Sequence, residues 1–282
     1  MLKQRILTAI ILLFILIDIL IIDNPWPFLL FISLLAVCGT WEWLRLTWHG
    51  KQRWLIYMVP AVVAVVTMSQ SWAIENDDYR FSTAFDLLVV LTALVWLLGM
   101  PLALARGRAD DPPHSAVWTV FAPFAMLATW WVFVSLFVQR GSLYLLSLLI
   151  VVWVADIAAF FVGRRWGKHK LAPNISPGKT REGAVGGLVA VVIWLLASTM
   201  WQGSFAQDLL QHWSWFGIVV WGIVLGAMSI MGDLFESLLK RRAHVKDSSR
   251  LLPGHGGVYD RIDALVVVLP VAFVLISIIY LQ

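Results

Sequence analysis

The chain has 282 residues, of which 60% are apolar or aromatic and 13% are charged, with a net charge of +4 and a mean hydropathy of +0.82. Because a soluble domain carries about 25% charged residues, this composition excludes an ordinary cytosolic enzyme, a disordered protein and a basic nucleic-acid-binding domain. The single cysteine, Cys38, excludes an internal disulfide bond.

Nine apolar stretches, each about 17–25 residues long, are long enough to cross the hydrocarbon core of a membrane as helices. They cover residues 6–22, 28–48, 54–72, 87–105, 116–138, 143–162, 183–202, 215–239 and 264–281. Only a helix satisfies its own backbone polar groups within one such segment. We therefore predict an all-α, polytopic integral membrane protein with about nine transmembrane helices. The first stretch lacks the small-residue cleavage site of a signal peptide, so we interpret it as a retained span.

The basic residues predict the orientation of these spans. If the N-terminus is cytoplasmic and the spans alternate, 19 of the 21 lysines and arginines fall on the cytoplasmic side, and only Arg80 and Arg140 fall on the other. Positive charge is concentrated in cytoplasmic loops of membrane proteins. We therefore expect a cytoplasmic N-terminus and a multi-pass protein of the inner (cytoplasmic) membrane.

The loops divide the chain into two regions. Residues 1–142 contain about five helices and no chemical motif, which predicts a transmembrane scaffold. Residues 143–282 contain two long cytoplasmic loops, 163–182 and 240–263, which hold 12 of the 21 basic residues. We therefore expect the catalytic region in the second half, with its active site facing the cytoplasm.

The first of these loops follows Asp156 and combines cations with glycines and hydroxyl groups. Its candidate substrate-binding residues are Arg164, Lys168, Lys170, Ser176, Lys179 and Thr180. Lysine, arginine and the backbone amides of glycine-rich turns bind phosphates. The alternative is a basic loop resting on anionic lipid headgroups, which requires only charge. The run Ile-Ser-Pro-Gly-Lys-Thr favours a shaped turn, but it is no P-loop, because Pro173 replaces the earlier glycine.

The second loop is flanked by carboxylates. Asp233 and Glu236 are three residues apart in the eighth apolar stretch and therefore share a helix face. A carboxylate at membrane depth is costly and is a functional candidate by default. Asp260 and Asp263 repeat this spacing, and the turn Pro-Gly-His-Gly-Gly that precedes them is able to bring them near Asp233. Asp247 is a fifth carboxylate in the same region.

Clustered carboxylates beside lysines and arginines are typical of a magnesium site that handles phosphate. The chain has none of the cysteine or histidine patterns of a zinc site. The alternative is a network of ion pairs that caps two helices at the membrane interface, although five carboxylates and six basic residues exceed what that role needs.

The second loop resembles a known signature. The spacing Ser237-x-x-Lys240-Arg241-x₄-Lys246-Asp247-Ser248-x₄-Pro253-Gly-His-Gly-Gly-x-x-Asp260-Arg261-x-Asp263 resembles that of phosphatidate cytidylyltransferases, also called CDP-diacylglycerol synthases. The runs Gly163-Arg164-x-x-Gly167-Lys168-x-Lys170-Leu171 and Ile175-Ser176-Pro177-x-Lys179-Thr180-x-Glu182-Gly183 are also similar to that family. The resemblance is strong over about residues 150–265, and it extends to the first half only in apolar character.

The resemblance implies transfer of a cytidylyl group from CTP to phosphatidic acid, giving CDP-diacylglycerol and pyrophosphate for phospholipid biosynthesis. It implies Mg²⁺ held by Asp233, Asp260 and Asp263, with a second cation left open. The expected catalytic residues are Asp233, Lys246, Asp247, Asp260 and Asp263. Besides the first loop, the expected substrate-binding residues are Lys240, Arg241, His255 and Arg261.

Other functions remain open at this point. A CTP-dependent membrane kinase acting on a polyprenol would give a phosphorylated alcohol instead of a CDP-lipid. A transporter would place its charges near the midplane and would show inverted repeats, whereas these charges crowd the inner face. A CDP-alcohol phosphotransferase would carry Asp-Gly-x-x-Ala-Arg, which is absent.

A homodimer is a further expectation. The small residues Gly183, Gly186 and Gly187 permit close approach of helices, either between two copies or within one chain.

Overall fold

The computed structural model describes residues 11, 14–22, 24–48, 50–78, 80, 82–107, 109, 111 and 115–280. Of the predicted first span, 6–22, the structure describes residues 11 and 14–22, and residues 14–21 of these are helical. The chain divides into two compact units. Unit 1 comprises Met1–Val89, Asp110–Val134 and Leu239–Asp263, and unit 2 comprises Val90–Ala109, Ser135–Leu238 and Ala264–Gln282.

Within the described part of the chain, seven helical segments are long and apolar enough to cross a membrane. They are α2 (Trp26–Thr47), α3 (Leu55–Glu75), the run of α4 (Ser82–Leu94), η1 (Val95–Gly99) and α5 (Met100–Arg106), α6 (Ala116–Arg140), α7 (Ser142–Trp166), α8 (Arg181–Ser198) and α10 (Trp215–Arg242). These segments coincide with seven of the nine predicted stretches, so the all-α, polytopic membrane class is confirmed.

The remaining elements are shorter. They are β1 (Lys170–Ala172), β2 (Ser176–Thr180), α9 (Phe205–His212), α11 (Tyr259–Ile262) and α12 (Leu265–Tyr280). Helix α12 occupies the predicted last span, and the structure describes 16 residues of it, Leu265–Tyr280. The count of nine spans therefore stays a prediction.

One span contains a change of helix type. Residues Val95–Gly99 form a π-helical segment, η1, between α4 and α5. Pro101 is the second residue of α5, and its ring carries no N–H for the carbonyl one turn earlier. A local shift to the wider helix accommodates this missing bond without ending the span.

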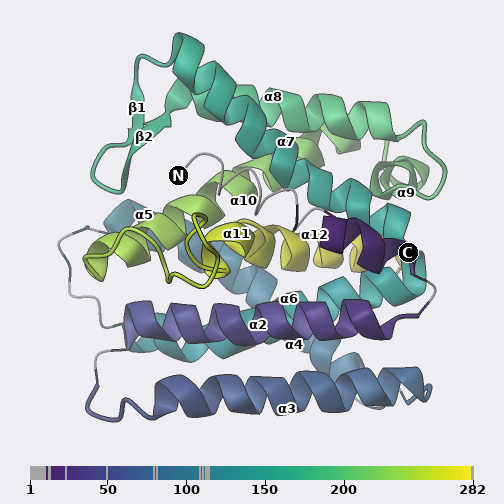
Figure 1. Ribbon diagram of the computed structural model, residues 1–282. Helices are drawn as coiled ribbons and strands as arrows, with labels where there is room; N and C mark the ends of the chain where they lie inside the picture. Colours follow the sequence, from purple (N-terminus) through teal and green to yellow (C-terminus); the bar gives the residue numbers. More distant parts are fainter. Residues whose placement is uncertain are drawn as a thin grey trace. The chain divides into compact units, whose positions relative to one another are not determined.

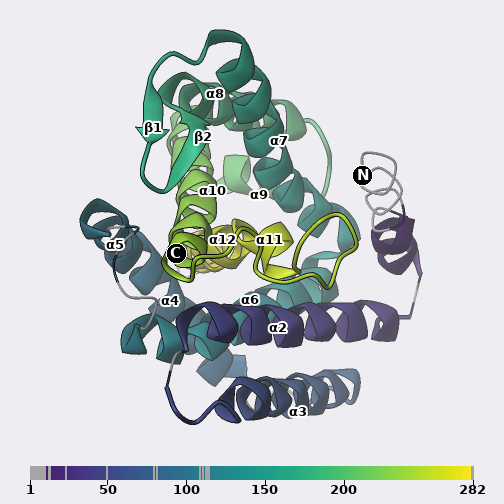
Figure 2. The same ribbon diagram turned by 60° about the vertical axis from the view of Figure 1, so that its left-hand side comes forward.

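Aromatic side chains pack in unit 1. Helices α2 and α3 run side by side (Figures 1 and 2). Trp43 of α2 is fully buried and stacks on Tyr259 of α11, with ring centroids 5.1 Å apart and planes inclined by 21°. Phe121 of α6 packs edge-on against Trp43, with ring centroids 6.2 Å apart. The beginning of α11 is therefore held against α2.

Unit 2 is organised around the pair α7 and α8. These helices lie side by side along their length, and the β1–β2 hairpin lies at one end of the pair (Figures 1 and 2). The strands are antiparallel, with Lys170 opposite Thr180 and Ala172 opposite Ser176. Helix α12 packs against α7 and η1. The hairpin occupies the predicted loop 163–182, so the shaped turn expected there exists as a small two-stranded sheet.

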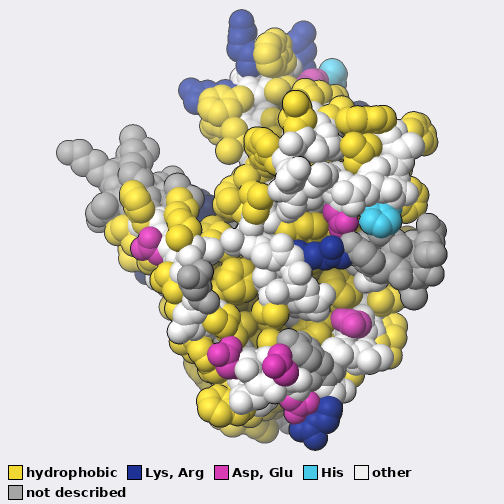
Figure 3. Space-filling model, turned by 90° about the vertical axis from the view of Figure 1, so that its right-hand side faces the viewer, with side chains coloured by type: hydrophobic (Ala, Val, Ile, Leu, Met, Phe, Trp, Pro, Cys, Tyr) yellow, Lys and Arg dark blue, Asp and Glu magenta, His cyan; other side chains and the backbone are white. Residues whose placement is uncertain are grey.

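Large apolar side chains remain exposed on several of these helices. Val62 and Val65 of α3 are 62% and 68% exposed, and Val185 of α8 is 60% exposed. Figure 3 shows hydrophobic side chains spread across the drawn face, with charged groups only in small separate areas. Such surfaces are costly in water and suit lipid, in agreement with a multi-pass membrane protein.

Candidate functional site

A cavity of about 520 Å³ opens in unit 2 where the hairpin meets three helices. Asp156 and Arg164 come from α7, and Lys179 comes from β2. Asp233 comes from α10. The other lining residues are Ala159, Phe160, Gly163, Leu171, Ser176, Gly178, Thr180, Gly183, Ala184 and Ile230. Five of the substrate-binding or catalytic residues predicted from the sequence therefore lie together, namely Arg164, Ser176, Lys179, Thr180 and Asp233.

An ion pair between the hairpin and α10 crosses this cavity. The Lys179 ammonium lies 2.6 Å from Oδ2 of Asp233, and the two side chains are 24% and 31% exposed. The hydroxyl of Ser237 is 3.4 Å from the other oxygen, Oδ1. A lysine in this place offers three donors to an anion that enters the cavity, and the carboxylate offers hard oxygen ligands to a cation.

The hairpin is joined tightly to α7 and α8. Thr180 caps α8, because its hydroxyl accepts the N–H of Gly183 at 3.1 Å. A Cβ on Gly167 would lie 2.8 Å from the Thr180 hydroxyl oxygen, and one on Gly183 would lie 2.7 Å from the carbonyl oxygen of Ala159. The absence of side chains at these two glycines therefore allows the strand that carries Lys179 to approach the helices.

The three glycines suggested for a dimer interface face α7 of the same chain. A Cβ on Gly186 would meet Val162 at 2.6–2.8 Å, and one on Gly187 would meet the Ala155 carbonyl oxygen at 2.9 Å. The structure therefore shows the second of the two alternatives, packing within one chain. The homodimer stays a prediction, but these three glycines no longer support it.

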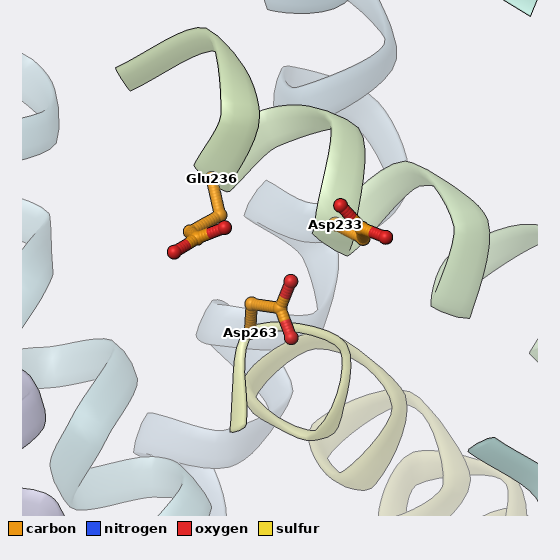
Figure 4. A group of neighbouring side chains, drawn as sticks. All are labelled: Asp233, Glu236 and Asp263. Carbon is orange, nitrogen blue, oxygen red and sulfur yellow. The ribbon is translucent and has the colours of Figure 1, made fainter. Parts of the chain in front are cut away.

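Helix α10 carries two carboxylates one turn apart. Asp233 and Glu236 project from it as shown in Figure 4, and each offers an oxygen within 4.8 Å of the other. Glu236 is buried, with 1% exposure. Two carboxylates at this spacing are chemically suited to a divalent cation.

The remaining basic residues of the first loop lie outside the lining of this cavity. Lys170 is in β1, Lys168 lies two residues before it, and both are exposed. Arg241, near the end of α10, is also exposed. Their predicted contacts with substrate stay predictions.

The second predicted loop, residues 240–263, belongs to unit 1 and folds around Asp260. Oδ1 of Asp260 lies 2.7 Å from the Lys240 ammonium. Oδ2 accepts the backbone N–H of Ser248 at 3.0 Å and that of Gly257 at 2.7 Å, and it also lies 3.0 Å from the Ser248 hydroxyl. Asp260 therefore closes the loop on itself. Its predicted role as a metal ligand stays a prediction, as does that of Asp263, which directly follows α11.

The turn in this loop requires glycine. Gly254 and Gly256 have φ angles of 76° and 86°, which L-amino acids with side chains rarely adopt. His255 lies between them, and its carbonyl oxygen accepts two hydrogen bonds from the Arg261 guanidinium, at 3.2 and 2.8 Å. Arg261 and His255 therefore help to close the turn, whatever contacts with substrate they also make.

A second cavity, of about 700 Å³, lies in unit 1 beside the same loop. Lys246 and Asp247, both predicted as catalytic residues, line it. Arg45 of α2 and Arg250 add two cations that the sequence analysis did not select. The guanidinium carbon of Arg45 lies 4.6 Å from the centre of the Trp41 ring, also in the lining. This cavity is therefore suited to an anionic group.

The sequence analysis also missed Glu42. This side chain of α2 is fully buried. It accepts hydrogen bonds from the hydroxyl groups of Ser248 and Ser249 and from the backbone N–H groups of Val258 and Tyr259, at the start of α11. The signal was available, because a carboxylate within an apolar stretch is a functional candidate by default.

Comparison with known proteins identifies the family. The model of the cytidylyltransferase family matches residues 3–279. A protein of Haemophilus influenzae named phosphatidate cytidylyltransferase is 32% identical over 289 residues, 96% of each chain. One of Pseudomonas aeruginosa with the same name is 35% identical over 273 residues, 96% of this chain and 95% of the other. One of Staphylococcus saprophyticus is 42% identical over 138 residues, about half of each chain. The chain belongs to the cytidylyltransferase family.

Proposed function

We propose that this protein transfers the cytidylyl group of CTP to phosphatidic acid, giving CDP-diacylglycerol and pyrophosphate. A phosphate oxygen of phosphatidic acid attacks the α-phosphorus of CTP, and the bond from that phosphorus to the oxygen bridging to the β-phosphate breaks. The electron pair leaves with pyrophosphate. The phosphate of phosphatidic acid is already a nucleophile, so the site needs no serine–histidine pair to activate it.

The observation that carries the proposal is the Lys179–Asp233 pair within a cavity lined by the family's motif residues. The nucleophile and CTP are both anions, so their approach requires cations that compensate the charge. Lys179 and Arg164 line the cavity and are placed to hold phosphate oxygens, the arginine through a bidentate contact. The relatives that cover nearly the whole chain carry the name of this reaction.

The carboxylates of α10 fit a divalent cation by the chemistry of their donors. Asp233 and Glu236 present oxygen atoms within 4.8 Å of each other, and Mg²⁺ prefers one or two carboxylates together with substrate phosphates and water. When bound, such a cation neutralises negative charge on the phosphates. Asp233 would then exchange its contact with Lys179 for the cation, which leaves the Lys179 ammonium available to a phosphate oxygen. Asp260 and Asp263 stay further candidate ligands.

The proposed location is the inner membrane of a bacterium, with the active site toward the cytoplasm. CTP arrives from the cytosol, whereas the acyl chains of phosphatidic acid stay in the bilayer. The distribution of the 21 basic residues supports this orientation, since only Arg80 and Arg140 fall on the opposite side.

The test is turnover of the purified protein in detergent with radiolabelled CTP, phosphatidic acid and Mg²⁺, followed by extraction of lipids. We expect label from the cytidine moiety in a chloroform-soluble CDP-lipid. Asp233→Asn should abolish this label, whereas Asp78→Asn, a change in the loop between α3 and α4, should not. A protein that incorporates no cytidine into lipid but phosphorylates a polyprenol from CTP would refute the proposal in favour of a membrane kinase.

A further inference from the structure

Glu42 lies in the half of the chain without family motifs, yet the hydrogen bonds that it accepts from described residues all come from the signature loop or from the start of α11. Its side chain is fully buried. Oε1 accepts the Ser249 hydroxyl at 2.5 Å and the N–H of Val258 at 3.0 Å. Oε2 accepts the N–H of Tyr259 at 2.6 Å and lies 2.9 Å from the Ser248 hydroxyl.

We propose that Glu42 is the positioning residue that holds the signature loop, residues 246–260, in its working conformation. The proposal rests on the proposed cytidylyl transfer, because it assigns to Glu42 the placement of groups that serve that reaction. Glu42 itself contacts no substrate in this assignment.

The hydrogen-bond donors around Glu42 support its assignment as a carboxylate that positions the backbone of the loop. An ionised carboxylate only accepts hydrogen bonds, and its two oxygens here face two hydroxyl groups and two backbone N–H groups. The N–H groups of Val258 and Tyr259 stand at the start of α11, where they have no carbonyl partner within the helix. A buried carboxylate is costly without such partners. The carboxylate and this loop conformation therefore depend on each other.

A single hydroxyl connects Glu42 to a carboxylate of the family signature. The Ser248 oxygen lies 2.9 Å from Oε2 of Glu42 and 3.0 Å from Oδ2 of Asp260, so its one proton is shared between two acceptors. The backbone N–H of Ser248 also donates to Asp260. A change at Glu42 is therefore transmitted through one residue to Asp260 and to its partner Lys240.

The same loop supplies chemical groups to the unit 1 cavity. Lys246 and Asp247 directly precede Ser248 and line that cavity. Ser248 and Ser249 line it as well and are held by Glu42. Displacing the serines would therefore move the lysine and the aspartate that the family signature contains.

The test compares Glu42→Gln with Glu75→Gln, the same change at an exposed position at the end of α3. Glutamine keeps the size of the side chain but turns one accepting oxygen into a donor, which faces donors. We expect kcat for CDP-lipid formation to fall about 10- to 100-fold in Glu42→Gln and to stay at the wild-type value in Glu75→Gln.

Hydrogen–deuterium exchange separates positioning from general destabilisation. Positioning predicts faster exchange in the peptides that cover residues 246–262 of Glu42→Gln and unchanged exchange in the hairpin, residues 170–180. Uniformly faster exchange in both segments, with kcat reduced only in proportion to the unfolded fraction, would overturn the proposal. So would wild-type kcat and exchange in Glu42→Gln.

Ser249→Ala keeps the proposal testable if Glu42→Gln fails to fold. It removes one donor to Glu42, and we expect a smaller fall in kcat with the same local increase in exchange; unchanged kcat and exchange would overturn the proposal. If Glu42→Gln folds, the double variant Glu42→Gln/Ser249→Ala should be no slower than Glu42→Gln alone, because both changes act on one contact.

The wild-type enzyme separates this inference from the proposed function. An active wild-type enzyme with unaffected variants would refute this inference alone, whereas an inactive wild type would refute the proposed function.

Discussion

Gly257→Ala should damage the signature loop severely. A Cβ at this position would lie 2.5 Å from Oε2 and 2.6 Å from Oε1 of Glu42, and would overlap the Ser248 hydroxyl oxygen. Ordinary van der Waals contact begins at 3.4 Å, so the carboxylate would have to retreat by about 0.8 Å. The φ angle of Gly257 is not in the left-handed region, so steric overlap rather than backbone strain is the cause.

The energy follows from the hydrogen bonds that this retreat would break. Glu42 accepts the N–H groups of Val258 and Tyr259 at 3.0 and 2.6 Å, and an increase of about 0.8 Å takes both beyond the usual limit of about 3.2 Å. Each hydrogen bond to a charged group contributes about 1.5–3 kcal/mol, so the two together contribute about 3–6 kcal/mol. If the loop must form for catalysis, activity should fall at least about 100-fold.

Two assays measure this effect. The midpoint of thermal unfolding in detergent should fall by at least about 6 °C, and the initial rate of CDP-lipid formation should fall as stated. The control is Gly50→Ala, where the three heavy atoms nearest to a Cβ would all belong to the Trp48 ring, at 3.1–3.3 Å. If Gly257→Ala matched Gly50→Ala in both assays, the close packing of Glu42 against this backbone would be refuted.

Three further changes test the unit 2 site. Thr180→Val should destabilise the protein by about 1 kcal/mol, because the cap on the N–H of Gly183 is lost, and Thr180→Ser should retain stability; equal melting temperatures for the two would contradict this. Lys179→Met should lower kcat/KM for CTP about 10- to 100-fold, since it removes the cation that faces Asp233, and an unchanged value would exclude Lys179 from phosphate binding. Chelation with EDTA should abolish turnover and added Mg²⁺ should restore it, whereas activity that survives chelation would exclude the metal.

The membrane helices were predictable because the bilayer imposes a simple rule. A helix that satisfies its own backbone in lipid must be apolar over about 20 residues, so composition alone located the seven long apolar helical segments found among the described residues.

The site was predictable as a set of residues but not as an arrangement. Charge and spacing selected Lys179 and Asp233 separately, and their pairing at 2.6 Å required the hairpin and α10 to be placed together. Glu42 itself was visible as a carboxylate within an apolar stretch, but its partners were not predictable. Its partners lie 206–217 residues further along the chain, and no local pattern connects a carboxylate to donors at that distance.

That separation has a consequence for biosynthesis. At about 5–20 residues per second, the ribosome completes α2 about 10–40 s before it adds the serines and backbone amides that Glu42 needs. Glu42 lies five residues before Thr47, the last residue of α2, and a charged side chain within an inserting helix is costly. The second helix is therefore made before the groups that donate hydrogen bonds to its carboxylate exist, and residues 248–259 supply these donors later.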